Sequence, residues 1–382
     1  MTAIERFDVA VIGGGTMGSA AAWALAKEGL RPVVLEQFTV VHDQGSHSGD
    51  TRIFRHAYAE SPDYVPLVQR ADELWQDLMA ATGEVILNRC GGLELSAPGH
   101  AHARSAREAA DIHGLSYEWL TPAEARSRWP QIAVPDDWDV LYSDASGFLN
   151  VEPAIRGMMR LAENAGATVK TGTPVTAWGS DGDSIWIETP SGRIEAGSAI
   201  ITAGAWAGRA LQDLGLPLHV RRKTLWWQRL RHPEQFTPER LPVFISASDI
   251  GGIYGFPCVD GASLKIANHL DGDVVDPDTV DRTTHEGENA DVVALAAQLF
   301  PDVTPEVVKS AVCLYMMTPD TDFILDRHPS LPNVAIGAGF SGHGFKFAPA
   351  VGEVLANLVT DLTYQTQGRF QLSRFETAGV AG

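Results

Sequence analysis

The first forty residues alternate apolar runs with a glycine-rich turn in a way that predicts a strand, a helix and a second strand. Apolar residues fill most of 7–12 and lead directly into three glycines, as expected for a buried parallel strand that ends in a tight turn. Over 17–25 the apolar residues recur at helical spacing, and Gly29 ends that pattern. The second strand covers 33–35, and Glu36 follows it. The pattern therefore predicts a complete βαβ unit.

The glycines of this unit have the G-x-G-x-x-G spacing of a dinucleotide-binding turn. Gly13 permits the tight turn, Gly15 lets the backbone approach a diphosphate, and Gly18 allows close packing of helix on strand. The N-terminus of the helix then faces the diphosphate. Glu36 is placed to accept hydrogen bonds from a ribose diol, which favours a free hydroxyl over a 2′-phosphate. Strand, helix and acid together predict dinucleotide binding, and FAD and NAD both remain open.

After the βαβ unit, the pattern of apolar positions predicts short strands and hairpins instead of regular alternation of strand and helix. A helical pattern over 151–165 precedes several short strands, and the turn at 190–192 joins two of them into a hairpin. Such a meander is typical of the later half of an FAD-binding domain. The segment 218–312 favours antiparallel strands with one helix over 290–300, and the strand over 334–339 leads into a second glycine-rich turn before a helix. We expect that turn to face the flavin ring.

These signals predict an α/β fold with α+β character, in which a Rossmann-like FAD-binding domain is interleaved with an antiparallel-sheet substrate domain. The FAD-binding domain is expected to comprise 1–89, 149–217 and 318–382. The substrate domain is expected to comprise 90–148 and 218–317. The chain has no repeat, low-complexity stretch or Pro/Ser-rich linker, which fits interleaved domains.

Composition narrows the range of partners. The chain has 382 residues, of which 45% are hydrophobic and 20% charged, so it can bury two or three cores. Its formal charge of −19 disfavours nucleic acid and anionic lipid as partners. No apolar stretch approaches the ~20 residues of a membrane helix, and the first strand starts too early to leave room for a signal peptide.

The cysteines indicate the cellular compartment of the protein, and the sequence lacks the common metal-binding motifs. Three widely spaced cysteines, Cys90, Cys258 and Cys313, argue against a disulfide framework and favour a reducing compartment, so a cytoplasmic location is expected. The sequence contains no Cys-x-x-Cys or His-Glu-x-x-His motif, and no metal is expected.

Three further blocks carry a family likeness that covers nearly the whole chain. They are GSHSGDTRIFRHAY at 45–58, AVCLY at 311–315 and GFSGHGFKF at 339–347, in that order after the dinucleotide motif. Together they resemble the family of monomeric sarcosine oxidase and N-methyltryptophan oxidase. The resemblance implies a monomeric flavoprotein amine oxidase with FAD in one domain. It also implies that an N-methyl or cyclic secondary amino acid binds against the flavin in the other domain.

The resemblance assigns roles to several charged residues and to one cysteine. Cys313 matches the cysteine bonded through sulfur to the flavin 8α-methyl group; without the flanking motif, a buried core thiol would be the better interpretation. Arg55 and Lys346 match the pair that holds the substrate carboxylate, a two-pronged guanidinium beside a point charge, and Lys346 is also expected to contact the cofactor. Arg52 matches an arginine beside the flavin, and Lys265 matches the lysine associated with oxygen activation.

The resemblance also supplies the expected walls of the substrate pocket. Tyr254 and His269 match pocket-lining residues, and Tyr315 lies two places beyond the flavin cysteine. His269 is assigned a positioning or electrostatic role. The resemblance implies that Gly342 and Gly344 place backbone amides near the flavin pyrimidine carbonyl, where negative charge accumulates on reduction.

The chain departs from the family pattern near the expected flavin. Ser48 stands where a second consecutive histidine is usual, and Met316 and Met317 replace a more polar pair. Ile245 and Asn268 also occupy positions where this chain is expected to differ. A more apolar pocket suits a substrate larger than sarcosine.

The sequence thus predicts an FAD-dependent oxidase of N-methyl or other secondary amino acids, which yields an imine and reduces O₂ to H₂O₂. A flavin-dependent dehydrogenase that passes electrons to another acceptor is the first alternative. A non-catalytic flavin-binding protein is the second.

Overall fold

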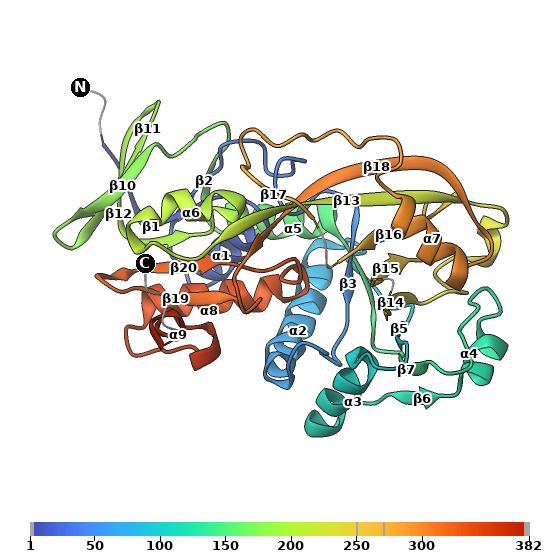
Figure 1. Cartoon of the computed structure of the whole chain (residues 1–382). Helices are drawn as coiled ribbons and strands as arrows, with labels where there is room; N and C mark the ends of the chain where they lie inside the picture. Colours follow the sequence, from blue (N-terminus) through green and yellow to red (C-terminus); the bar gives the residue numbers. More distant parts are fainter. Residues whose placement is uncertain (1–3, 250, 270–271, 378–382) are drawn as a thin grey trace.

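The computed structural model describes residues 4–249, 251–269 and 272–377, and Figure 1 shows its two large sheets side by side. The first sheet has eight strands, in the order β10-β11-β12-β1-β2-β9, with β20 paired to β12 and β19 paired to β20. The pairs β1–β2, β1–β12, β2–β9 and β12–β20 are parallel. The strands are β1 (Glu5–Ile12), β2 (Pro32–Leu35), β9 (Thr168–Lys170), β10 (Ala177–Asp181), β11 (Ser184–Thr189), β12 (Gly192–Ile201), β19 (Ile324–His328) and β20 (Leu331–Ala338).

The helices that cover this sheet pack closely against one another because their contact surfaces carry small side chains. The helix α1 (Thr16–Lys27) buries a run of alanines against α5 (Val151–Asn164) and α8 (Ala348–Thr360), and α2 (Val65–Thr82) joins the same hydrophobic cluster. A Cβ at Gly352 of α8 would lie only 2.5 Å from the backbone of Ala20, so this crossing requires glycine. The predicted βαβ unit is confirmed, with its helix held between strand and neighbouring helices.

The second sheet has nine strands in the order β17-β13-β16-β15-β14-β5-β7-β6, with β18 paired to β13. All its pairs are antiparallel except β14–β5. Figure 1 shows the long strands β13 and β18 running from this sheet toward the first one. The strands are β5 (Gly92–Ser96), β6 (Glu118–Leu120), β7 (Asp139–Ser143), β13 (His219–Leu230), β14 (Val243–Ala247), β15 (Ile253–Phe256), β16 (Ser263–Asn268), β17 (Val274–Val275) and β18 (Val303–Met317). The helices α3 (His102–His113), α4 (Pro122–Arg128) and α7 (Ala290–Leu299) accompany it.

A third, three-stranded sheet consists of β3 (Thr51–Phe54), β4 (Leu87–Asn88) and β8 (Gly147–Asn150). The chain also forms the short helices α6 (Ala207–Ala210) and α9 (Ser373–Thr377). The mixed α/β class, the hairpin formed by β11 and β12 and the helix α7 are confirmed.

The strands of the two large sheets come from the two sets of segments predicted as domains, although the domain division itself stays a prediction. Within the described ranges, no helix is both long and apolar enough to cross a membrane.

Candidate active site

A cavity of about 760 Å³ lies at the carboxyl ends of the parallel strands in the first sheet. The ends of β1, β2, β12 and β20 contribute Ile12, Leu35, Thr202 and Ala338 to its lining. Its volume falls within the range of ~300–1,000 Å³ typical of ligand pockets. Ligands of doubly wound sheets bind at this edge, where the glycine turns lie.

Each glycine of the first turn has the geometry that the sequence predicts. Gly13 has φ +98°, and a Cβ there would overlap the carbonyl oxygen of Thr202. A Cβ at Gly18 would overlap the carbonyl oxygen of Gly13, so the helix can pack on the turn only without a side chain. A Cβ at Gly15 would meet nothing closer than the His47 ring at 3.8 Å. Gly15 therefore borders the open space in which a diphosphate would lie.

Glu36 lies in the cavity wall and is almost fully buried. Its carboxylate accepts hydrogen bonds from the backbone amides of Gly14 and Phe38, each at 2.8 Å. These contacts fix the glycine turn to the end of β2. A carboxylate has about four acceptor positions, so contact with a ribose hydroxyl remains open to it. The ribose role of Glu36 stays a prediction.

The other end of the cavity is formed by the second glycine-rich loop, 339–344, together with Tyr315 and Arg52. Gly342 has φ +80°, and a Cβ there would overlap the ring of Tyr315. A Cβ at Gly344 would lie 2.7 Å from the side chain of Phe340. Both glycines are thus required for the loop to pack closely against Tyr315 and Phe340, and both border the cavity.

Cys313 lies on β18 next to Leu314 and Tyr315, which line the cavity, and its thiol is free and buried. Burial raises the pKa of the thiol, while the nearby cations Arg52, Lys265 and Lys223 act in the opposite direction. The three cations favour the thiolate, which is the nucleophilic form of cysteine. The structure therefore brings the predicted flavin cysteine together with Arg52 and Lys265.

Arg52 and Lys265 are both held by the backbone of the 46–51 segment. The guanidinium of Arg52 donates to the carbonyls of Ser46, Ser48, Gly49 and Thr51 at 2.7–2.8 Å. The ammonium of Lys265 donates to the carbonyls of Gly49 and Thr51 at 2.9 and 2.8 Å, and to the Thr51 hydroxyl at 3.0 Å. Burial lowers the pKa of Lys265 well below its ordinary value.

Tyr254, His269 and Tyr315 form one group around the same region. The two tyrosine hydroxyls are 3.4 Å apart, and the His269 ring centroid lies 5.7 Å from that of Tyr315 and 6.2 Å from that of Tyr254. Burial lowers the pKa of His269 to about 3, so its imidazole is neutral at pH 7. A neutral ring can accept or donate a hydrogen bond without adding charge to the site.

Arg55 and Lys346 lie close together and are buried, with 3% and 6% of their surface exposed. Both approach the ring of Tyr58, at 4.5 Å for Arg55 and 5.1 Å for Lys346. The ammonium of Lys346 donates to the carbonyl of His343 at 2.9 Å, and burial lowers the pKa of Lys346 to about 7. Two buried cations at one place are suited to bind an anion.

Acidic residues that the sequence analysis missed surround Arg55. Its Nη2 donates to both carboxylate oxygens of Glu60, at 2.7 and 2.6 Å, and its Nε lies 3.8 Å from a carboxylate oxygen of Glu94. That Nε is buried and has no hydrogen-bond partner. The Glu94 carboxylate also pairs with His102 at 2.5 Å. The sequence signal for Glu94 is a charged residue between two leucines in a strand.

The sequence analysis also missed Tyr58 and His343, which connect an N-terminal segment of the chain with a C-terminal one. The Tyr58 hydroxyl lies 2.6 Å from Nδ1 of His343.

Among the residues that the structure describes, no group of three or more His, Cys, Asp or Glu side chains is arranged to hold a metal ion.

A comparison of the sequence with protein families identifies the class of cofactor. Residues 8–358 match the family model described as FAD dependent oxidoreductase. The chain belongs to this family. It is 39% identical over 360 residues to monomeric sarcosine oxidase from Bacillus sp. (strain NS-129), covering 93% of each chain. It is 35% identical over 378 residues to N-methyl-L-tryptophan oxidase from Salmonella arizonae, covering 97% of this chain and 99% of the relative.

Solved structures show the same fold. NikD, an unusual amino acid oxidase essential for nikkomycin biosynthesis, has a TM-score of 0.84 at 24% identity, with 96% of this chain and 97% of NikD covered. L-proline dehydrogenase from P. horikoshii has a TM-score of 0.84 at 24% identity, with 98% and 99% covered. These two structures show the fold of the chain.

The residues present fit FAD. The cavity runs from the open side of Gly15 and the acid Glu36 to a glycine-rich loop with backbone amides, and cations lie beside its far end. The dinucleotide half would lie on the first turn, and the ring would lie near Tyr315 and Gly342.

Proposed function

We propose that this FAD-dependent oxidoreductase oxidises N-methyl or other secondary amino acids to imines and passes the electrons to O₂, which forms H₂O₂. The relatives named sarcosine oxidase and N-methyl-L-tryptophan oxidase, matched over nearly the whole chain, support this reaction. The observation that carries the proposal is the pair of buried cations, Arg55 and Lys346, beside the loop at the flavin end of the cavity. When bound, FAD supplies the two-electron acceptor.

Arg55 and Lys346 are proposed to bind the carboxylate of the amino acid. Their buried position strengthens the ion pair relative to one in water. Glu60 already binds the guanidinium of Arg55, so a substrate carboxylate has to replace it. The side chain of Glu60 is 28% exposed and has a route toward solvent, whereas that of Glu94 is only 6% exposed and would remain beside Arg55. Carboxylate capture then fixes the amine and its carbon near the ring.

Cys313 is proposed to carry FAD covalently. Forming the bond replaces an S–H and a C–H bond with a C–S bond, and the two electrons and two protons released pass through the flavin to O₂. Burial raises the pKa of the thiol, and the three cations around it support this role because they oppose that rise and so favour the thiolate. Acid precipitation should leave a yellow pellet with the parent protein and a colourless one with Cys313→Ala. A colourless parental pellet would refute covalent attachment while leaving bound FAD possible.

Lys265 and Arg52 are proposed to stabilise negative charge at the flavin and on reduced oxygen. Tyr254, His269 and Tyr315 are proposed to line the substrate side. The neutral imidazole of His269 supports a positioning role, because it adds no charge that would repel or attract the amine. Partly buried Met317 packs against the cluster of Tyr315 and Tyr254, whereas Met316 packs into the core of the first sheet. Met317 therefore makes the substrate side more apolar, which favours a substrate larger than sarcosine.

The proposed reaction is tested by oxygen uptake and peroxide release with sarcosine, N-methyl-L-tryptophan and L-proline. N-methylamines without a carboxylate serve as the control, and they should react poorly because they cannot use Arg55 and Lys346. Flavin reduction with electrons passed only to an added dye would instead identify a dehydrogenase. Absence of flavin reduction by every amine would identify a non-catalytic flavin-binding protein.

We also propose that the enzyme acts as a monomer in the cytoplasm. The three cysteines, all free in the structure, are consistent with a reducing compartment. Native mass spectrometry and fractionation of the source cells test the two statements separately.

A further inference from the structure

The loop that borders the flavin end of the cavity is held in a strained conformation. Among the non-glycine residues of the described ranges, only Ser341 and Thr321 have positive φ, at +47° and +63°. Ser341 belongs to the cavity-lining loop 339–344, and Thr321 belongs to the turn that follows β18. Such conformations are strained and persist only where surrounding contacts fix them. The contacts that fix these two residues are therefore part of how the loop is positioned.

The two strained residues are connected to each other. The Ser341 hydroxyl lies 3.2 Å from the hydroxyl of Thr318, which in turn donates to the carbonyl of Asp322 at 2.8 Å. The carbonyl of Thr321 lies 3.0 Å from Nε2 of His343, a second residue of the cavity loop. The turn 318–322 thus contacts the loop at both Ser341 and His343.

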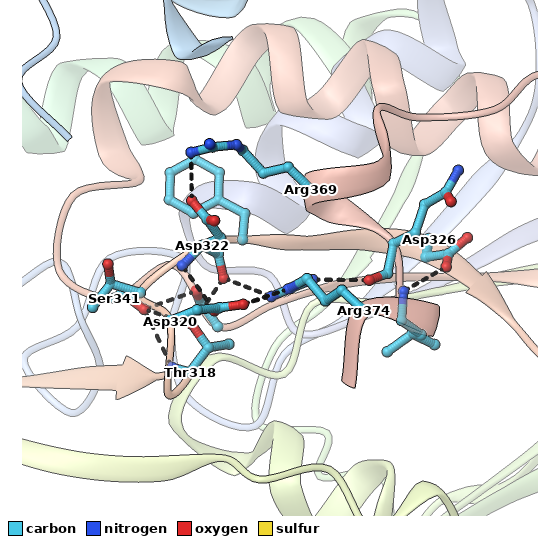
Figure 2. Close-up of polar contacts among 12 residues, drawn as sticks. Thr318, Asp320, Asp322, Asp326, Ser341, Arg369 and Arg374 are labelled. Atoms are coloured by element: carbon cyan, nitrogen blue, oxygen red, sulfur yellow. Dashed lines mark hydrogen bonds and ion pairs between the residues drawn. The ribbon is translucent and has the colours of Figure 1, made fainter. Parts of the chain in front are cut away.

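The C-terminal segment holds the other side of this turn (Figure 2). Nε and Nη2 of Arg374 donate to the Asp320 carboxylate at 2.8 and 3.4 Å, and Nη2 also donates to the Asp322 carbonyl at 2.9 Å. Nη1 of Arg369 donates to the Asp322 carboxylate at 3.2 Å. The Arg374 side chain is only 13% exposed, so its guanidinium is shielded from water, whereas the Asp320 side chain is 38% exposed. The guanidinium of Arg374 therefore binds both the Asp320 side chain and the backbone of the turn at Asp322.

We propose that the C-terminal segment 368–375 is a positioning element of the active site, in which Arg374 acts through Asp320 and Asp322 to hold the loop 339–344 against the flavin. Arg374 acts through the turn 318–322, so it is a positioning residue and not a catalytic one. The inference rests on the proposed placement of the flavin ring beside Gly342. If the loop relaxes, its amides move away from the carbonyl on which negative charge accumulates, and the reduced ring loses stabilisation.

The test measures the flavin and not only turnover. Sulfite binds oxidised flavin more tightly when nearby donors stabilise negative charge on the ring, and its binding bleaches the visible absorbance. We expect Arg374→Met to raise the sulfite Kd of the holoenzyme about two- to thirtyfold, the range that corresponds to a positioning effect of about 0.5–2 kcal/mol. Its flavin reduction potential should fall in the same variant. Arg156→Met removes an exposed ion pair with Glu152 on α5 and should leave both values unchanged.

A second variant distinguishes the loss of this ion pair from a general loss of stability in Arg374→Met. Asp320→Asn keeps the size and one oxygen of the side chain but removes the charge that Arg374 binds, and it should shift the sulfite Kd in the same direction. A lowered Tm with sulfite affinity and reduction potential within twofold of the parent would overturn the inference and leave the C-terminal segment a purely structural brace. A parent protein that holds no flavin would overturn the proposed function, and this inference with it.

Discussion

Lys346 should give carboxylate binding a pH dependence that can be traced to one side chain. Burial lowers its pKa to about 7, so about half of the ammonium is charged at pH 7 and only ~1% at pH 9. The neighbouring imidazoles do not titrate in this range, because burial lowers the pKa of His269 to about 3 and that of His343 to about 4. Between pH 7 and 9, Lys346 is therefore the member of the cation pair whose charge changes, because Arg55 stays charged.

Acetate is the appropriate probe because it carries a carboxylate and no amine that titrates. Its Kd, measured as a perturbation of the flavin spectrum, should rise about tenfold per pH unit above pH 7, since only the protonated site offers both cations. The rise should stop at about 10- to 150-fold, the value of one charge-assisted hydrogen bond of about 1.5–3 kcal/mol, because Arg55 stays charged. In Lys346→Met the Kd should be high and independent of pH. A variant that kept the parental pH dependence would refute the assignment.

The same pKa predicts a stability effect whose sign follows from proton binding. The folded pKa of about 7 lies below the ordinary value of 10.5, so the unfolded chain binds more protons between these values. The contribution of Lys346 to stability therefore rises with pH over that window and is smallest below pH 7. From pH 7 to pH 9 the gain is about 2 kcal/mol, which Lys346→Met should lose. Denaturant unfolding of both proteins at the two pH values measures the difference.

Three further predictions address other parts of the site. Lys265→Met should slow reoxidation of the reduced flavin by about 10²–10³ in stopped-flow mixing with O₂, with anaerobic reduction nearly unchanged; reoxidation at the parental rate would exclude Lys265 from oxygen activation. Glu60→Gln should tighten acetate binding about tenfold, because a neutral amide competes less well for Arg55; weaker binding would show that Glu60 assists the anion. Gly342→Ala should lose about 1–3 kcal/mol of stability in thermal unfolding, because its φ is +80° and its Cβ would overlap Tyr315. Gly208→Ala on α6, with open space around its Cβ, is the matched control and should be neutral.

The parts of the structure that depend on local geometry were predictable from the sequence. A tight turn after a buried strand requires a residue that tolerates positive φ, and Gly13 supplies it. Close packing of α1 on that turn excludes a side chain at Gly18, so the spacing of the motif already carries the shape of the cavity. The alternation and turn residues around 190–192 likewise fixed the hairpin.

The surroundings of Arg55 could not be predicted because they are assembled from distant segments. Glu60 follows Arg55 in the chain, but Glu94 comes from the second sheet, and its proximity depends on how that sheet lies against β3. Tyr58 and His343 meet across 285 positions of sequence. Only the unusual charge within β5 hinted at Glu94, and nothing in the residue type of Ser341 indicated its left-handed backbone.

Anaerobic mixing of the holoenzyme with a panel of N-methyl amino acids tests the central claim most directly. At least one of them should bleach the flavin absorbance completely, and air should then restore it with one H₂O₂ released per flavin. A flavin that stays oxidised with every secondary amino acid would contradict the account.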